Sequence, residues 1–142
     1  MKRKYKRKNK DDDYKYENEK EIKENIEIKI NEKKIEFNYN FKFNKEGNYI
    51  IEYLFKKNLT KTDYMFHGCR KLTNLNLSNF NTNNIVNMQY MFANCNSLKN
   101  LNFSNCNIQK ATNTEGMFNN CISLKKKNII TKDNKILKAF EK

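Results

Sequence analysis

One stretch of the chain, residues 65–124, repeats itself with a fixed step of 26 residues. The box Met-Phe-x-x-Cys-x-x-Leu occurs three times, beginning at Met65, Met91 and Met117. Between the boxes, Leu-x-Leu-Ser-Asn-Phe-Asn at Leu75 returns as Leu-x-Phe-Ser-Asn-Cys-Asn at Leu101. A period of this length is typical of solenoids, in which each unit buries its apolar face against its neighbours. The repeat therefore predicts a stack of similar coils.

Two shorter periodicities share each 26-residue unit. Apolar residues spaced by three or four predict one face of a short helix, formed by Ile85, Met88, Met91, Phe92, Cys95 and Leu98. After the first box, the spacing of Leu72, Leu75 and Leu77 predicts the inward side chains of a short strand. The expected class is an α/β solenoid of about four rungs, each with a short helix and a short strand.

The chain before the repeat alternates apolar and polar residues. Three such runs, over 26–30, 35–43 and 49–55, are separated by turn-like connectors, as in β-strands. They predict a three-stranded antiparallel meander. One period before Leu75 and Leu77 stand Tyr49 and Ile51. We therefore expect the third strand to form the first rung, and the other two to cover the open end of the stack.

These patterns divide the chain into four segments. We predict a disordered charged tail over 1–20, a β-meander cap over 21–58, a repeat core over 59–128 and a C-terminal cap over 129–142. Seven of the first ten residues are Lys or Arg, and the basic block is Lys2–Lys10. No run of 18 apolar residues exists, and no apolar stretch follows the basic start. A cytoplasmic location is expected, or a surface location if the chain is a fragment of a longer protein.

The cysteines follow the repeat. One column of the period holds Cys69, Cys95 and Cys121, while Cys106 lies in the column of Phe80. A Cys-x-x-Cys motif is absent and His67 is the one histidine, so the usual spacing of a zinc site is missing. We interpret these cysteines as small apolar core residues. A disulfide or a metal site is the alternative.

Catalytic chemistry has little support in the sequence. His67 lies two residues from Cys69, and such positions point apart on a helix, so a Cys–His dyad is not expected. The Met-Phe pairs have core spacing, whereas the column of Tyr64 and Tyr90 is expected to be partly exposed. The chain lacks a carboxylate pair and a Gly-rich loop. We predict no catalytic residue, no cofactor, no metal site and no enzymatic activity.

The combined motif from Met65 to Thr82, with its copy from Met91, resembles the BspA-like class of leucine-rich repeat. This class is also described as a mycoplasma lipoprotein-associated repeat of unknown function. The resemblance covers roughly residues 49–131, and it implies a leucine-rich-repeat solenoid, often on microbial surface proteins, engaged in adhesion or protein binding. It implies no catalytic residues. The position that usually holds a bend-stabilising Asn is occupied by Phe80 and Cys106.

The outward side chains of the predicted strands are the candidate binding face. Stacking would place them in polar columns that become more basic towards the C-terminus: Asn74, Asn76, Lys99, Asn100, Asn102, Lys125, Lys126 and Asn128. Solenoids bind partners with such extended surfaces. We expect a protein–protein interaction module whose partner is a protein. The alternative is a binder of RNA or an acidic membrane surface, through Lys2–Lys10 and Lys125–Lys127, because the formal charge of the chain is +13.

Overall fold

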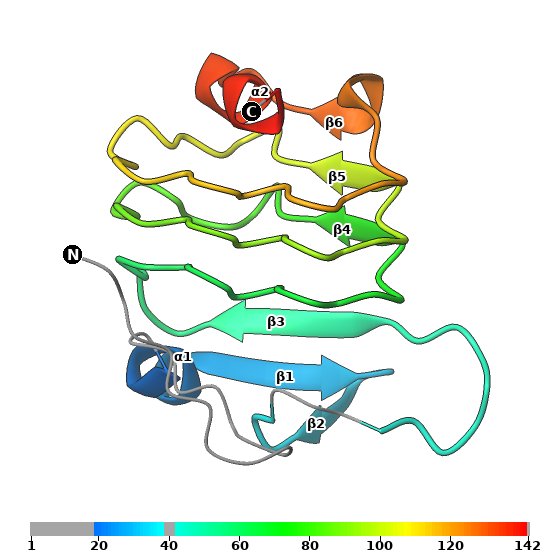
Figure 1. Ribbon diagram of the computed structural model, residues 1–142. Coiled ribbons are helices and arrows are strands. Elements are labelled where there is room, and N and C mark those ends of the chain that lie inside the picture. Colours follow the sequence, from blue (N-terminus) through cyan, green and yellow to red (C-terminus); the bar gives the residue numbers. More distant parts are fainter. Residues whose placement is uncertain (1–18, 39–41, 142) are drawn as a thin grey trace, which may run out of the picture.

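The computed structural model describes residues 19–38 and 42–141 of the 142-residue chain. Its elements, in chain order, are α1 (Glu19–Asn25), β1 (Ile26–Ile30), β2 (Lys33–Ile35), β3 (Ile51–Phe55), β4 (Asn74–Asn76), β5 (Asn100–Asn102), the 3₁₀ turn η1 (Lys126–Asn128), β6 (Ile129–Ile130) and α2 (Asn134–Phe140). The strands form an antiparallel sheet, β2-β1-β3, and a parallel sheet, β4-β5-β6 (Figure 1). Apart from Glu19 and Lys20, the predicted tail lies outside the described residues.

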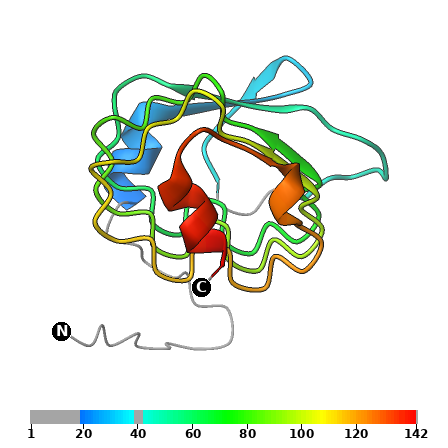
Figure 2. The same cartoon turned by 90° about the horizontal axis from the view of Figure 1, so that it is seen from above.

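The 26-residue period of the sequence reappears as pairing between successive turns of the chain. In the parallel sheet, Leu75 pairs with Leu101, and elsewhere in the turns isolated bridges join Lys61 to Asn87 and Asn87 to Asn113. Seen along the axis of the stack, these turns superpose (Figure 2). Equivalent side chains therefore fall into columns, with Phe66, Phe92 and Phe118 stacked at ring-centroid distances of 5.7 and 5.6 Å.

The segments between the strands consist of tight turns, and the helix predicted over residues 85–98 is absent. Four amides there donate to the carbonyl three residues earlier: those of Met91, Ala93, Cys95 and Leu98. The amides of Met88, Tyr90, Phe92 and Asn94 donate instead to the next turn, at Asn113, Glu115, Met117 and Asn119. Tyr90 and Asn94 have φ angles of 53° and 63°, which an α-helix cannot contain. Every second amide from Met88 to Asn94 thus holds adjacent turns together.

The antiparallel sheet differs from the predicted meander in its strand order. Asn31 and Glu32 both have positive φ, as in a two-residue hairpin that folds β2 back onto β1. The long connection to β3 then returns the chain to the other edge of β1, where Ile28 faces Tyr53. The central strand is therefore β1. The predicted second strand, over 35–43, pairs only through β2, and its residues 39–41 lie outside the described residues.

The third strand does not continue the parallel sheet as expected. In the described residues β3 pairs with β1, and no pairing joins it to β4. It lies between β1 and the first turn of the stack (Figure 1). Its contact with that turn comes from side chains, with Tyr53 at 5.3 Å from Phe66 and Phe55 at 4.4 Å from Phe80, measured between ring centroids. Aromatic packing thus joins β3 to the first turn of the stack.

The far end of the stack is covered by α2 (Figures 1 and 2). Ile136 and Ala139 of this helix are buried, and the ring of Phe140 packs edge-on against Phe118. Asp133 begins the helix as its N-cap and also accepts a hydrogen bond from the buried amide of Ile108 at 2.9 Å. One carboxylate therefore holds both the helix and the last turn beneath it.

The pairing register between β5 and β6 is shifted by two residues from the 26-residue period. Leu101 pairs with Ile129, 28 residues later, whereas the period would place Lys127 in that inward position. Burial of an unpaired lysine ammonium is unfavourable. The 3₁₀ turn η1 takes up the two extra residues, so Lys127 is exposed and Ile129 is buried. Ile129 thus takes the place of Leu101, rather than that of Phe103 as the period had suggested.

Candidate binding surface on the parallel sheet

The eight residues predicted as the binding face lie on β4, β5 and the segment around η1. Pairing of β4 with β5 places Asn74 beside Asn100 and Asn76 beside Asn102. Leu75 and Leu101, between them, point towards the core, so the asparagines point outward. Six of the eight are exposed, and Asn102 and Asn128 are half-buried. The structure therefore brings the predicted residues together, although their side chains differ in what they contact.

Asn76 and Asn102 stabilise their own turns. Their Oδ1 atoms accept hydrogen bonds from the backbone amides of Ser78 and Ser104, at 3.0 and 2.9 Å. This is the Asx turn, in which an Asn side chain bonds the amide two residues on. Two further repeat positions do the same, Asn81 with its equivalent Asn107, and Asn87 with its equivalent Asn113. Asn76 and Asn102 thus each support a turn, and their assignment to the binding face stays a prediction.

Asn74 and Asn100 form an amide ladder on the outer face. The Nδ2 of Asn100 donates to Oδ1 of Asn74 at 2.7 Å, and the Nδ2 of Asn74 donates to the hydroxyl of Thr73 at 3.1 Å. These bonds leave the Oδ1 of Asn100 outside the ladder, and both residues are exposed. The ladder fixes the two side chains relative to one another before any partner arrives.

The other four residues of the face differ in whether their side chains have a partner within the chain. Lys126 forms an ion pair with Glu141, and the Nδ2 of Asn128 donates to the backbone carbonyl of Lys99 at 3.0 Å. Within residues 19–38 and 42–141, no carboxylate pairs with Lys99 or Lys125, and both side chains are exposed. Lys99 and Lys125 are thus exposed without an ion-pair partner among the described residues, whereas Lys126 and Asn128 each have a partner within the chain.

The cysteine column lies inside the stack. The thiols of Cys95 and Cys121 donate to the carbonyls of Phe66 and Phe92 in the preceding turn, at 3.0 and 3.1 Å. Burial raises the pKa of Cys95 to about 12 and that of Cys121 to about 11. All four cysteines are free thiols, with Cys69 half-buried and the others buried. This placement agrees with the core interpretation and makes these thiols poor nucleophiles.

His67 makes a polar contact with the next turn of the chain. Groups of three His, Cys, Asp or Glu side chains suited to a metal do not occur in the described part of the chain. His67 is exposed, and its Nε2 lies 3.1 Å from the Nδ2 of Asn94 in the next turn. Partial burial, and then the charge of Arg70, lowers its pKa. The contact makes His67 part of a polar column with Asn94 and Asn120.

Two sets of equivalent positions have a left-handed backbone that the sequence analysis did not predict. Tyr64, Tyr90 and Gly116 are equivalent in the repeat, and their φ angles are 61°, 53° and 57°. The same holds for the column of Gly68, Asn94 and Asn120. Gly and Asn are the residues that most readily adopt this conformation. Their recurrence at equivalent positions was the signal that could have predicted turns in place of a helix.

The basic block Lys2–Lys10 lies outside the described residues. The other basic candidates, Lys125, Lys126 and Lys127, are exposed around η1. Neither α-helix in residues 19–38 and 42–141 has the length or the apolar character needed to span a bilayer.

A protein-family model matches most of the chain. The model of the family described as "Mycoplasma protein of unknown function, DUF285" matches residues 12–135. No curated protein and no solved structure matches the chain.

Proposed function

Given that this chain belongs to the family described as "Mycoplasma protein of unknown function, DUF285", we propose a function from its own surface. It is a small solenoid of the BspA-like leucine-rich-repeat class, and it binds a protein partner without catalysing a reaction. The proposal has two parts, the repeat architecture and the binding face, and each rests on a different set of contacts.

The proposed solenoid class is supported by hydrogen bonds between turns. Backbone amides at Thr62, Tyr64, Phe66 and Gly68 donate to carbonyls 25 residues later, and Met88, Tyr90, Phe92 and Asn94 repeat the pattern one turn on. Nearest-neighbour contact of this kind is the defining property of stacked repeats. The sequence motif of the BspA-like class supports the narrower assignment.

The binding face is supported by one observation, the fixed and exposed ladder of Asn74 and Asn100 beside the unpaired Lys99. Their amide groups and ammonium offer hydrogen-bond donors and acceptors to a polar or acidic partner surface. A side chain held in place before binding loses less conformational entropy when the partner arrives. The face therefore combines partner-accessible polar groups with a rigid backbone, as extended repeat surfaces do.

Affinity measurements on matched variants test this proposal. The face variant carries Asn74→Ala, Lys99→Ala and Asn100→Ala, whereas the control removes the same residue types outside the sheet, at Asn83, Asn119 and Lys138. Proteins retained from lysate of the source cells by the native chain would be purified and titrated calorimetrically. A hydrogen bond contributes about 0.5–1.5 kcal/mol net, so the face variant is expected to bind roughly 10- to 100-fold more weakly.

The control variant is expected to keep the native affinity. Equal affinity of the face variant and the native chain would refute the binding face, and so would equal losses in the two variants. Failure of any protein to be retained would refute the function itself.

A further inference from the structure

The positive charge of the described residues is concentrated in the stack and its C-terminal end. Residues 59–141 contain eleven Lys and Arg against four Asp and Glu, whereas residues 19–58 contain nine Lys against eight Glu. The antiparallel part is therefore nearly neutral. Lysines are distributed along both parts, whereas only two glutamates, Glu115 and Glu141, follow Glu52.

The four carboxylates of residues 59–141 are engaged within the fold. Asp63 is buried, and Glu115 accepts hydrogen bonds from Gln89 and Tyr90. Asp133 accepts from two backbone amides, and Glu141 pairs with Lys126. None of them is in an ion pair with Lys125 or Lys127. These two ammonium groups are therefore uncompensated among the residues that the structure describes.

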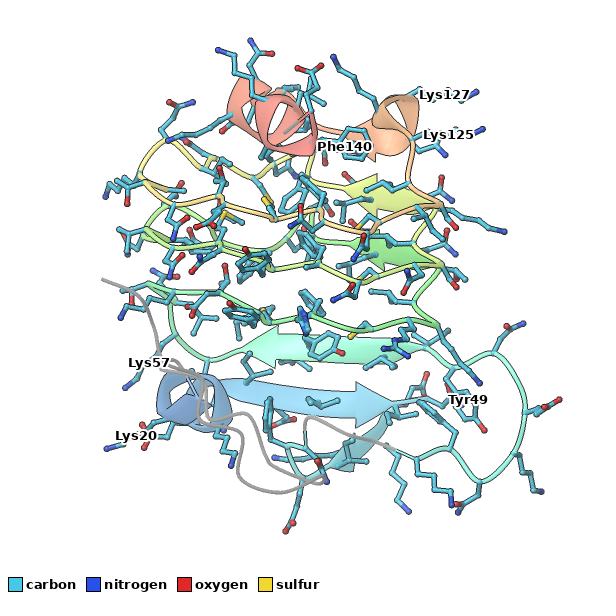
Figure 3. All side chains as sticks on the ribbon, in the orientation of Figure 1. Lys20, Tyr49, Lys57, Lys125, Lys127 and Phe140 are labelled. Carbon is cyan, nitrogen blue, oxygen red and sulfur yellow. The ribbon has the colours of Figure 1, made fainter. Side chains whose placement is uncertain are left out.

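The uncompensated lysines lie together at one corner of the stack. Lys125 and Lys127 are exposed and flank Lys126 at the start of η1, and both side chains project from the same side of the molecule (Figure 3). Lys99 is the equivalent of Lys125 in the turn below, and paired strands lie about 4.8 Å apart. Like charges at such spacing repel, so the arrangement is more stable when an anion lies against it.

Two exposed isoleucines stand close to these lysines in the sequence. Ile122 is 79% exposed and Ile130 is 59% exposed, and they stand three residues before Lys125 and three after Lys127. The segment 122–130 contains no Arg and no aromatic residue. Reading of nucleic-acid bases relies on Arg and on aromatic stacking. Lysine next to exposed aliphatic side chains is instead the composition that suits the interface of an anionic bilayer.

We propose that the corner formed by residues 122–130 binds the surface of anionic lipid bilayers. Lys125 and Lys127 would contact the phosphate and carboxylate headgroups, while Ile122 and Ile130 enter the boundary between headgroups and acyl chains. Binding of this kind is peripheral, salt-dependent and reversible. It shares Lys125 with the protein-binding face, but it uses none of the three residues changed in the face variant, so the two tests can be scored separately.

Vesicle flotation of the full chain tests the proposal. The vesicles contain phosphatidylcholine with or without about 40% phosphatidylserine, a proportion that gives a strong negative surface potential. Each lysine near such a surface contributes roughly a fivefold change in partitioning, so Lys125→Gln with Lys127→Gln is expected to weaken binding about 25-fold. The matched control, Lys45→Gln with Lys57→Gln, removes the same charge from the antiparallel part and is expected to retain binding. Lys57 lies at the other end of the molecule (Figure 3).

A second pair separates lipid from other polyanions. Ile122→Ser with Ile130→Ser is expected to weaken binding to the serine-lipid vesicles and to leave binding to polyuridylate RNA unchanged. Equal losses for the two lysine pairs would overturn the proposal, because binding would then follow net charge or the basic block. Absence of vesicle binding, combined with RNA binding that the Lys125 and Lys127 changes abolish, would also overturn it and assign the corner to nucleic acid. Circular dichroism melts would verify that each variant is folded.

Discussion

Removal of the central ring of the phenylalanine column is the perturbation that the fold predicts to be most damaging. Phe92 is fully buried and stacks between Phe66 and Phe118, at centroid distances of 5.7 and 5.6 Å. Its edge also meets the ring of Phe103 at 5.8 Å. Truncation to alanine thus opens a cavity in the middle rung and removes three aromatic contacts at once.

The magnitude follows from these contacts. Buried Phe→Ala changes reduce the free energy of unfolding by about 3–5 kcal/mol. Each aromatic pair contributes about 0.5–1.5 kcal/mol beyond area burial. A loss near the upper end of the first range, about 5 kcal/mol, is therefore expected for Phe92→Ala. Domains of this size are stable by only about 5–15 kcal/mol, so the variant should be close to unfolding.

Urea denaturation followed by circular dichroism measures this change. The matched control is Phe43→Ala, because Phe43 is half-buried and its ring packs against Tyr49 at 4.1 Å, outside the stack. A loss below about 1.5 kcal/mol is expected for the control, in the range of a single aromatic pair. If Phe92→Ala lost less than about 2 kcal/mol, or no more than Phe43→Ala, the stacked column could not be the centre of the core.

Three further predictions concern other parts of the fold. Gly116→Ala should lower the free energy of unfolding by about 3 kcal/mol, because φ is +57° and the new Cβ would lie 2.2 Å from the Tyr90 ring. Gly68→Ala, at φ +72° with open space around the new Cβ, should lower it by only about 1 kcal/mol. Equal losses of the two variants in a thermal melt would contradict this. Burial raises the pKa of Cys95 from its ordinary 9.0 to about 12, so the folded chain keeps a proton that the unfolded chain releases, and stability should fall as pH rises from 9 towards 12. In urea titrations at pH 8, 9 and 10, the stability of Cys95→Ala should fall less steeply with pH than that of the native chain. The same dependence on pH in both would refute the assignment. Asp133→Ala should lower the free energy of unfolding by about 3 kcal/mol, because it removes a helix cap and leaves the buried amide of Ile108 without its acceptor. Faster hydrogen exchange confined to that end of the stack would support this. Uniformly faster exchange along the chain would contradict it.

Much of the stack followed from the sequence because the repeat has a single strict period. Once Leu75 and Leu101 are recognised as equivalent, the period also predicts which other side chains of successive units lie over one another. The pairing of these two leucines in β4 and β5 shows the same separation of 26 residues. The burial of Cys95 and Cys121 could be predicted in the same way, since both stand between apolar neighbours of the box.

Local backbone conformation was harder to predict. Apolar residues three apart suit both a helix and a run of turns closed by hydrogen bonds to the third preceding residue. The choice between them depends on Tyr90 and Asn94 in the left-handed region, and tyrosine seldom adopts that conformation. Strand order in the antiparallel sheet was also mispredicted, because the long connection between β2 and β3 lets β3 pair with the other edge of β1 instead of with β2.

The roles of side chains of the same residue type on the candidate face could not be told apart from the sequence. Asn74 and Asn76 both point outward from β4, and the sequence treats them alike. Asn76 is followed by a turn whose amide at Ser78 lies within its reach, whereas Asn74 has only Thr73 and Asn100 to bond. Which outward asparagine forms a turn can therefore be told only when the backbone beyond the strand is known.

The central claim, that equivalent positions of successive 26-residue units lie directly against each other, is tested most directly by scalar couplings across hydrogen bonds in NMR. The amide of Phe92 donates to the carbonyl of Met117 at 3.0 Å, and that of Phe66 to the carbonyl of Met91 at 2.9 Å. A coupling from the Phe92 amide nitrogen to the Met117 carbonyl carbon is the predicted result. A coupling from the same nitrogen to the carbonyl of Met88, four residues earlier, would place a helix there and contradict the stacked turns.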